Sequence, residues 1–179
     1  MLKTIHDLDL TKQQLSNDDY KFQPELTSIL DEIDQDFDQN IINQIVLWKV
    51  NRYSQLDEST LLLLNRINRH DLIINIDHTE EILRHLLSTK GIQLAMASTI
   101  LRFKNPNVCQ IIDQRVYRFI YGEIMPKYFS SIDIQITLYM EYLEKLREVC
   151  KHKQIDFVLA DRILYDLDKK YNKDEKIKY

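Results

Sequence analysis

The residues best suited to chemistry in this sequence lie between its two glycines, Gly91 and Gly122. Gly91 separates two helical patterns, where a tight turn needs a residue that tolerates positive φ. Further along, an Asn-Pro-Asn turn leads to Asp113, a lone acid that directly follows two isoleucines. A carboxylate beside apolar residues can be desolvated, which raises its pKa and suits it to general-base or cation-stabilising work.

Asp113 has three compatible interpretations. It can cap the helix that begins after it, which is the commonest role of an aspartate at such a position. It can pair with Arg115 or Arg118, which follow it closely. It can also face a pocket, because one carboxylate oxygen is sufficient for the cap and the other is then available to a substrate.

The turn at Gly91 predicts a site for phosphate. The backbone N–H groups at the start of the following helix have no partners within that helix, and the helix dipole favours an anion there. Lys90 would add a positive charge, and such a site holds a nucleic-acid backbone without reading its sequence. On spacing alone, a plain αα-hairpin with a glycine cap is the simpler interpretation.

This part of the sequence resembles the helix-hairpin-helix DNA glycosylase superfamily, the base-excision enzymes with the endonuclease III and 8-oxoguanine glycosylase fold. The resemblance lies in the run Gly-Ile-Gln-Leu-Ala-Met-Ala-Ser that begins at Gly91, and in Asp113 within Ile-Ile-Asp-Gln-Arg-Val. It covers roughly residues 85–122. The family's fold is helical and contains a helix-hairpin-helix unit.

The resemblance implies that Asp113 is catalytic. In the family, the corresponding aspartate stabilises the oxocarbenium-like sugar or activates the nucleophile while the bond to an extruded base breaks. Members that also cleave the strand use a lysine near the start of the helix after the hairpin, where this sequence has Ala95. We therefore expect a monofunctional DNA N-glycosylase that removes a damaged or modified base.

A second hypothesis is a catalytically inert relative that keeps the fold as a DNA-binding or protein-interaction module. Gln93 replaces the second glycine of the family's hairpin, which weakens close approach to a phosphate. The formal net charge of -4 also gives no global positive field for nucleic acid. Both features favour the module.

The predicted nucleic-acid contacts form two groups. The group around the hairpin and Asp113 comprises Lys90, Gly91, Gln93, Lys104, Arg115 and Arg118. Ion pairing with nearby acids is the competing interpretation of its charged members. In the second group, Trp48 would stack on an extruded base while Lys49 and Arg52 contact phosphates. A core tryptophan beside two solvated charges is the favoured interpretation of that second group.

The composition predicts an all-α fold. Two glycines and three prolines leave few of the turns that a β-rich fold needs, and 44% hydrophobic residues can supply a core. Helical periodicity then predicts one domain over residues 1–179, a compact bundle of about eight helices. Residues 1–23 are expected to form a loose arm or a short helix, and residues 172–179 a frayed tail.

Capping signals predict where several helices begin. Pro24 is expected in the first turn of one helix, and Asp57 is expected to cap another that ends near His70. Asp77, followed three residues later by Glu80, resembles a capping box for the next helix. These signals divide the chain into segments of helical length.

The sequence gives no indication of a cofactor or a metal. Two cysteines, Cys109 and Cys150, cannot supply the four ligands of an iron–sulfur cluster or a structural zinc, and the five histidines show no paired ligand spacing. No stretch has the length of a membrane span, and the N-terminus lacks a signal-peptide pattern. We therefore predict a cytoplasmic protein with no membrane association, and the resemblance implies DNA as its partner.

Overall fold

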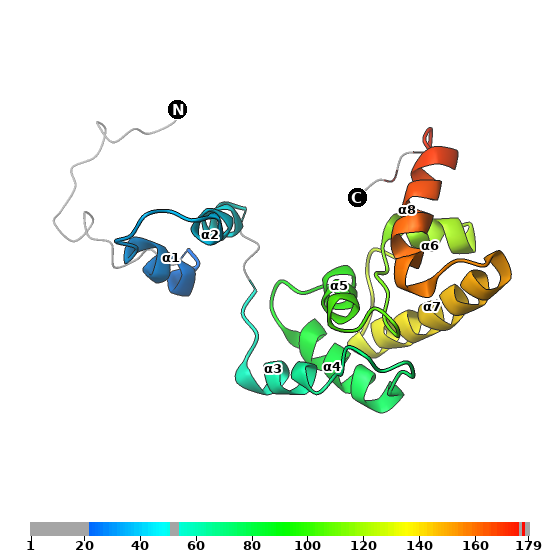
Figure 1. The fold of residues 1–179 in the computed structure, drawn as a ribbon, viewed down its shortest axis with the longest axis horizontal. Helices are drawn as coiled ribbons and strands as arrows, with labels where there is room; N and C mark the ends of the chain where they lie inside the picture. Colours follow the sequence, from blue (N-terminus) through cyan, green and yellow to red (C-terminus); the bar gives the residue numbers. More distant parts are fainter. Residues whose placement is uncertain (1–21, 51–53, 176, 178–179) are drawn as a thin grey trace. The chain divides into compact units, whose positions relative to one another are not determined.

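The computed structural model is all-helical, as the sequence predicts. It describes residues 22–50, 54–175 and 177, and within these ranges there are α-helices, one short 3-10 helix and no strand. The chain divides into two compact units, Met1–Tyr53 and Ser54–Tyr179 (Figure 1). A single domain over residues 1–179 stays a prediction. The predicted N-terminal arm lies outside the described residues, apart from its last two.

The first unit contains a pair of helices, α1 (Pro24–Asp31) and α2 (Gln39–Lys49). Pro24 is the first residue of α1, where its missing N–H costs no intrahelical hydrogen bond. The Trp48 indole Nε1 donates to Thr27 Oγ1 at 2.9 Å, and its ring meets that of Phe22 edge-on at 5.1 Å between centroids. Trp48 therefore joins the two helices.

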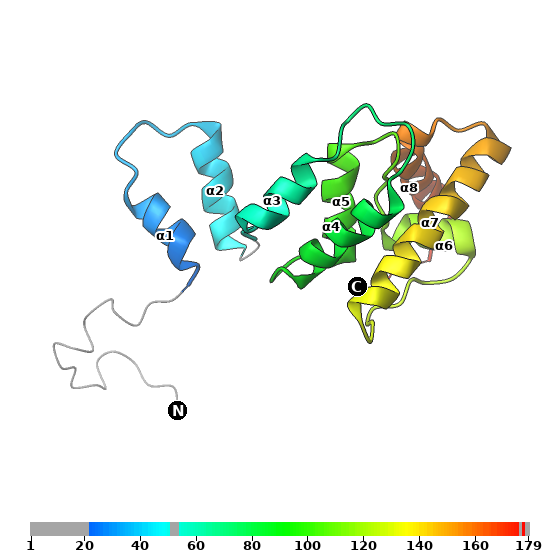
Figure 2. The ribbon, with the colours of Figure 1, turned by 90° about the horizontal axis from the view of Figure 1, so that it is seen from below.

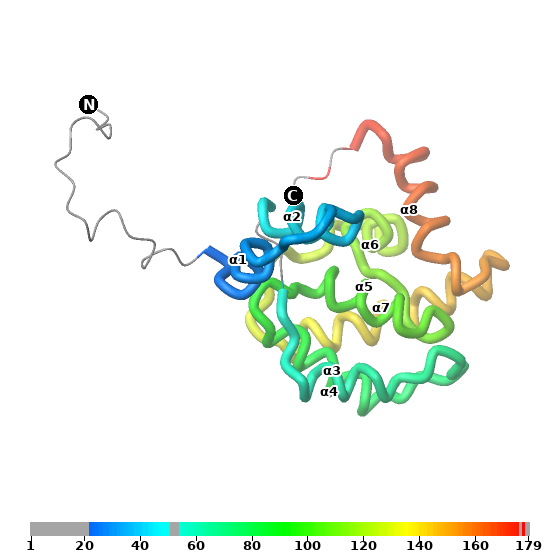
Figure 3. Tube along the Cα trace, turned by 60° about the vertical axis from the view of Figure 1, so that its left-hand side comes forward, coloured from blue at the N-terminus to red at the C-terminus, as the bar shows by residue number. Residues whose placement is uncertain are grey.

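Six α-helices make up the described part of the second unit. They are α3 (Glu58–Asn65), α4 (Ile76–Ser88), α5 (Leu94–Lys104), α6 (Gln114–Tyr121), α7 (Ile132–Lys153) and α8 (Ala160–Tyr171), with the 3-10 helix η3 (Phe157–Leu159) before α8. The longest helix, α7, packs against α4, α5 and α6 (Figure 2). Helix α3 lies beside α4 (Figure 3), and α6 packs along α8.

The core of the second unit forms where α4, α5 and α7 meet. Ile82 and Leu86 of α4, Leu101 of α5 and Leu146 of α7 are fully buried within it. Burying such a side chain contributes roughly 1.5–3 kcal/mol. This packing fixes the two helix starts, of α5 and α6, that carry the candidate chemistry.

Side-chain caps begin the helices, and one of them differs from the prediction. Asp57 accepts a 2.7 Å bond from a first-turn N–H and starts α3, as predicted. Helix α4, however, is capped by Asn75, whose side chain accepts from the backbone N–H of His78 at 3.1 Å. The predicted capping box at Asp77 is therefore wrong, because the Asn75 carbonyl already accepts an intrahelical bond from Thr79.

Helix α3 is shorter than predicted, ending at Asn65 rather than near His70. Its last turn closes with i→i−3 bonds, from the N–H groups of Arg66 and Ile67 to the carbonyls of Leu63 and Leu64. The loop that follows is held by Asn105, a fully buried side chain at the end of α5. Its Nδ2 donates to the carbonyls of Asn68 at 2.8 Å and Asp71 at 3.0 Å. These bonds hold the loop after α3 against the end of α5.

Candidate active site

The turn between α4 and α5 requires its glycine. Gly91 has φ +88°, a left-handed conformation, and a Cβ at this position would lie 2.8 Å from Ser54 Oγ. Gln93 follows in an extended conformation as the N-cap of α5, and its side chain makes no capping hydrogen bond. The first N–H groups of α5 therefore lack a side-chain cap from Gln93, as the phosphate-site interpretation requires.

Asp113 caps α6 with one carboxylate oxygen. Its Oδ1 accepts from the backbone N–H groups of Arg115 and Val116, both at 2.8 Å. In the described part of the chain, no hydrogen bond engages Oδ2. Burial raises the pKa of Asp113, although the two backbone bonds and the Arg115 charge act in the opposite direction. The capping interpretation is confirmed, and the second oxygen remains available.

Two tyrosines of α7 hold the extended segment that leads to Asp113. Tyr142 Oη donates to the Ile111 carbonyl at 2.7 Å, and Tyr139 Oη donates to the Gln110 carbonyl at 3.0 Å. Both tyrosines are fully buried. A buried carbonyl needs a hydrogen-bond partner. The two tyrosines supply the hydrogen bonds that a neighbouring strand would provide in a sheet.

The same segment is held by two further side chains. From α5, Ser98 Oγ accepts from the backbone N–H of Ile112 at 3.2 Å. From α7, Arg147 Nη2 donates to the Val108 carbonyl at 2.9 Å. The backbone before Asp113 is thus fixed by both α5 and α7, which restricts where the carboxylate can lie.

Asp113 lines a pocket of about 530 Å³ beside the start of α5. Ala95 lines it from α5, and Met125, Lys127 and Tyr128 line it from the loop between α6 and α7. The pocket therefore brings together Asp113 and the position where the sequence has alanine in place of the family's lysine. These two positions come from different helix starts.

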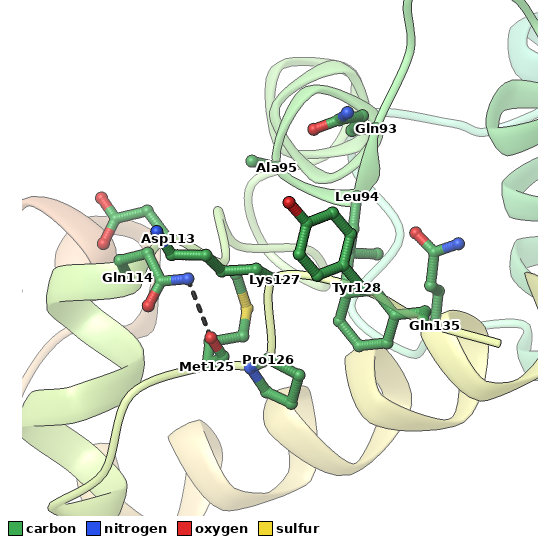
Figure 4. A pocket seen from close by; sticks show the side chains of 11 residues that line it. Gln93, Leu94, Ala95, Asp113, Gln114, Met125, Pro126, Lys127, Tyr128 and Gln135 are labelled. Atoms are coloured by element: carbon green, nitrogen blue, oxygen red, sulfur yellow. Dashed lines mark hydrogen bonds between the residues drawn. The ribbon is translucent and has the colours of Figure 1, made fainter. Parts of the chain in front are cut away.

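Figure 4 shows how these side chains lie. Asp113 stands at one edge of the pocket with its carboxylate pointing away from Tyr128, and Lys127 extends toward it. Tyr128 is 92% exposed, although it lines the pocket. The Gln114 side-chain Nε2 donates to the Met125 carbonyl at 2.9 Å, which ties the loop to the start of α6.

A second pocket, of about 360 Å³, reaches Asp113 from the side of α8. Asp161 and Tyr165 of α8 line it together with Ile111. Asp161 is buried, and its Oδ2 lies 3.6 Å from Arg102 Nε. The Asp113 carboxylate therefore borders two pockets, of which the first is the larger and contains Ala95.

Arg115 and Arg118 are directed to Asp168 of α8. Arg118 Nε and Nη2 donate to the two oxygens of Asp168 at 2.8 and 2.9 Å, and Arg115 Nη1 donates to Oδ2 at 3.1 Å. Asp168 is fully buried. Burial opposes ionisation of Asp168, but the bonds from Arg118, Asn172 and Arg115 outweigh it and hold its pKa below the ordinary value. Both arginines are therefore engaged in ion pairs, the alternative to the predicted nucleic-acid contacts, and these ion pairs join α6 to α8.

The other predicted contacts of the hairpin group lie at opposite ends of α5. Lys90 and Gly91 precede the helix, and Gln93 lines the larger pocket. Lys104 is the last residue of α5, and its Nζ donates to Asn65 Oδ1 at 2.9 Å. The structure therefore does not bring Lys104 into the pocket that contains Asp113.

The predicted contacts in the first unit are partly described. Trp48 is half-buried and makes the contacts within its own unit given above, in keeping with the favoured structural interpretation. Lys49 is exposed at the end of α2. Arg52 lies outside the described residues.

Sequence reasoning missed the groups that position Asp113. A buried tyrosine hydroxyl needs a hydrogen-bond partner, so Tyr139 within a long helical pattern carried a usable signal. Tyr142 carried the same signal. Ser98 and Asp168 carried none, because their partners are set by packing between helices that are distant in sequence.

Within the described residues, no group of three or more His, Cys, Asp or Glu side chains is arranged to hold a metal ion. Cys109 and Cys150 are both buried and unbridged, and burial raises the pKa of the Cys109 thiol to about 11. In the same ranges, no helix combines the length and apolar character needed to cross a bilayer.

Comparison with known proteins yields no match to a protein-family model, to a curated protein or to a solved structure. The family resemblance therefore rests on the hairpin residues and Asp113.

Proposed function

We propose that the protein acts on DNA as a monofunctional N-glycosylase, in which Asp113 assists the departure of a damaged or modified base. The observation that carries the proposal is the pocket of about 530 Å³ that Asp113 shares with Ala95. It joins the acid before α6 to the start of α5, which follows the hairpin. Such a pocket is the kind of site that an extruded base requires.

The chemistry depends on the second oxygen of Asp113. Breaking an N-glycosidic bond leaves positive charge on the sugar, and a preorganised carboxylate in a water-poor site stabilises that charge. The two 2.8 Å bonds to Oδ1 orient the carboxyl group and leave Oδ2 for the sugar or for an attacking water. The raised pKa of Asp113 also makes it a better general base toward water.

The surroundings of the pocket suit a nucleotide. Leu94 and Phe129 give it apolar walls, and Gln93 and Gln135 add amide groups that can hydrogen-bond a base edge. Lys127 lies at the edge near Asp113, where an ammonium group can contact a flanking phosphate. Ala95 provides no amine, so water is the expected nucleophile and the product is an intact strand with an abasic site.

A second candidate function is the inert binding module. The observation that favours it is that Asp113 caps α6 while Arg115 and Arg118 hold Asp168. These roles explain all three side chains without catalysis. In that case the hairpin would bind DNA and the pocket would process nothing.

The test uses duplexes that each carry one deaminated, oxidised or alkylated base. After incubation with the protein, each strand is analysed with and without hot alkali, which cleaves abasic sites. We expect cleavage of at least one lesion duplex only after alkali. Cleavage without alkali would contradict the monofunctional mechanism, and binding without base release from any duplex would favour the module.

A further inference from the structure

A group of cations gathers at the C-terminal end of α5, the end opposite to the Asp113 pocket. Lys104 Nζ donates to Asn65 Oδ1 at 2.9 Å, and Arg69 Nη1 donates to the Phe103 carbonyl at 3.0 Å. Arg66 directly follows Asn65 and is exposed. Arg66 also lines a small pocket with Asn105, the residue that follows Lys104. Arg66, Arg69 and Lys104 therefore all lie around the C-terminal end of α5, and we name them the α5 basic cluster.

No ion pair among the described residues neutralises the charges of the α5 basic cluster. In the ranges that the structure covers, the ion pairs to carboxylates use other cations, such as Arg84 with Asp133 and Lys145 with Glu148. The loop after α3 contains a single acid, Asp71, which is exposed and lines a small pocket with Arg66, and none of the ion pairs within the described residues involves it. Three unneutralised cations on one surface attract a polyanion.

The surface between the cluster and the pocket carries no negative side chain from α5. The chain has 28 acidic residues, yet residues 82–112 contain neither aspartate nor glutamate. This stretch includes the turn at Gly91 and the whole of α5. The side chains of Met96 and Phe103, seven residues apart on one side of α5, are 47% and 57% exposed to solvent. A polyanion lying along α5 would therefore meet no carboxylate of that helix.

The loop that carries the cluster is rigidly held. Asn105 donates to the carbonyls of Asn68 and Asp71, and Asn107 Nδ2 donates to the Arg69 carbonyl at 2.9 Å. Because the backbone is already fixed, binding a ligand here would order few additional groups.

We propose that the α5 basic cluster binds the phosphate backbone of duplex DNA, about five base pairs from the nucleotide in the Asp113 pocket. The inference rests on the proposed function for the identity of its ligand. The 11 residues of α5 span about 16 Å at 1.5 Å per residue. At 3.4 Å per base pair, this length corresponds to about five base pairs of duplex. The contact is made to phosphates, so it is independent of sequence.

The test is the salt dependence of binding to an undamaged 20-base-pair duplex. The variant Arg66→Gln/Arg69→Gln/Lys104→Gln should lower the slope of log K against log salt by about 2.7, at about 0.9 per phosphate contact. At 0.15 M salt its affinity should fall on the order of 100-fold. The matched control, Lys145→Gln/Lys151→Gln/Lys153→Gln, removes the same charge from α7 and should leave the slope nearly unchanged.

Two further measurements keep the result interpretable. Arg66→Gln alone leaves the bonds of Arg69 and Lys104 in place, and it should lower the slope by about 0.9 in a normally folded protein. A lesion duplex that is shortened to two base pairs on one side should lose the effect of the triple variant, because it no longer reaches the cluster.

The outcomes separate the inference from the proposed function. If the salt slope falls in the triple variant but the wild-type protein excises no lesion, DNA binding by the cluster is supported and the proposed glycosylase activity is contradicted. An unchanged slope in folded variants overturns the cluster, whether or not bases are released. Binding of poly-L-glutamate that depends on the cluster, with duplex binding that does not, would assign the surface to an acidic protein. A wild-type protein that binds no duplex at low salt would contradict both.

Discussion

The Tyr142 hydroxyl donates a 2.7 Å hydrogen bond to the carbonyl of Ile111, two residues before Asp113. This bond links the middle of α7 to the segment that ends at the cap of α6. The position of the candidate catalytic acid therefore depends on a helix that follows it in sequence. Tyr139 makes the equivalent contact one residue earlier, at the Gln110 carbonyl.

Removing the Tyr142 hydroxyl should loosen the segment before Asp113. Tyr142→Phe leaves the Ile111 carbonyl without this donor, and we expect a loss of about 1–3 kcal/mol in the free energy of unfolding, measured by urea denaturation. Tyr142→Phe should also slow base release, and Tyr139→Phe should slow it less, because the bond that it removes is longer and farther from Asp113. Equal stability of Tyr142→Phe and wild type would show that the bond does not hold the segment.

Asp168 should be among the most sensitive residues for stability. Asp168→Asn removes the buried carboxylate that Arg118 contacts with two nitrogens, and breaking such a pair costs about 3–5 kcal/mol. Thermal unfolding measures the loss. Asp166→Asn, two residues away on α8 and exposed, is the control and should leave the melting temperature nearly unchanged. A similar small effect in both variants would contradict the role given to Asp168.

The cap and the charge of Asp113 can be separated by stability measurements. Asp113→Ala loses the cap and should cost about 1 kcal/mol, whereas Asp113→Asn keeps an acceptor oxygen. Because burial raises the pKa of Asp113 in the fold, its ionised form is disfavoured there relative to the unfolded chain. Asp113→Asn should therefore be more stable than wild type at neutral pH.

The pH dependence of that difference fixes its cause. The gain from Asp113→Asn should be fully present above the raised pKa and should disappear as the pH falls below the ordinary value of 3.8, where Asp113 is protonated in both states. Urea denaturation of both proteins between pH 3 and pH 8 measures it. A gain that grows toward low pH would show that the pKa is lowered instead.

Local features of the fold were predictable from sequence. Asp57 and Asp113 both cap the helices expected of them, because an N-cap depends on a few neighbouring residues. The start of α4 was not predictable at this level, since Asn75 and Asp77 are both good caps. The course of the loop after α3 also depends on a distant residue, Asn105.

The contacts of the site that join residues distant in sequence could not be predicted from the sequence. Arg118 and Asp168 are 50 residues apart, and the chain offers 28 acids as partners, so no spacing rule selects this pair. The meeting of Ala95 and Asp113 in one pocket likewise depends on how α5 and α7 pack around the segment before α6. Patterns within one helix carry no such information.

The most direct test of the central claim is the single-turnover rate of base release by wild type and Asp113→Asn on the same lesion duplex. We expect Asp113→Asn to be slower by about 10²–10⁴-fold, with unchanged duplex affinity because asparagine keeps the helix cap. The wild-type rate should fall as the pH drops through the raised pKa of Asp113. Equal rates for the two proteins would contradict a catalytic role for Asp113.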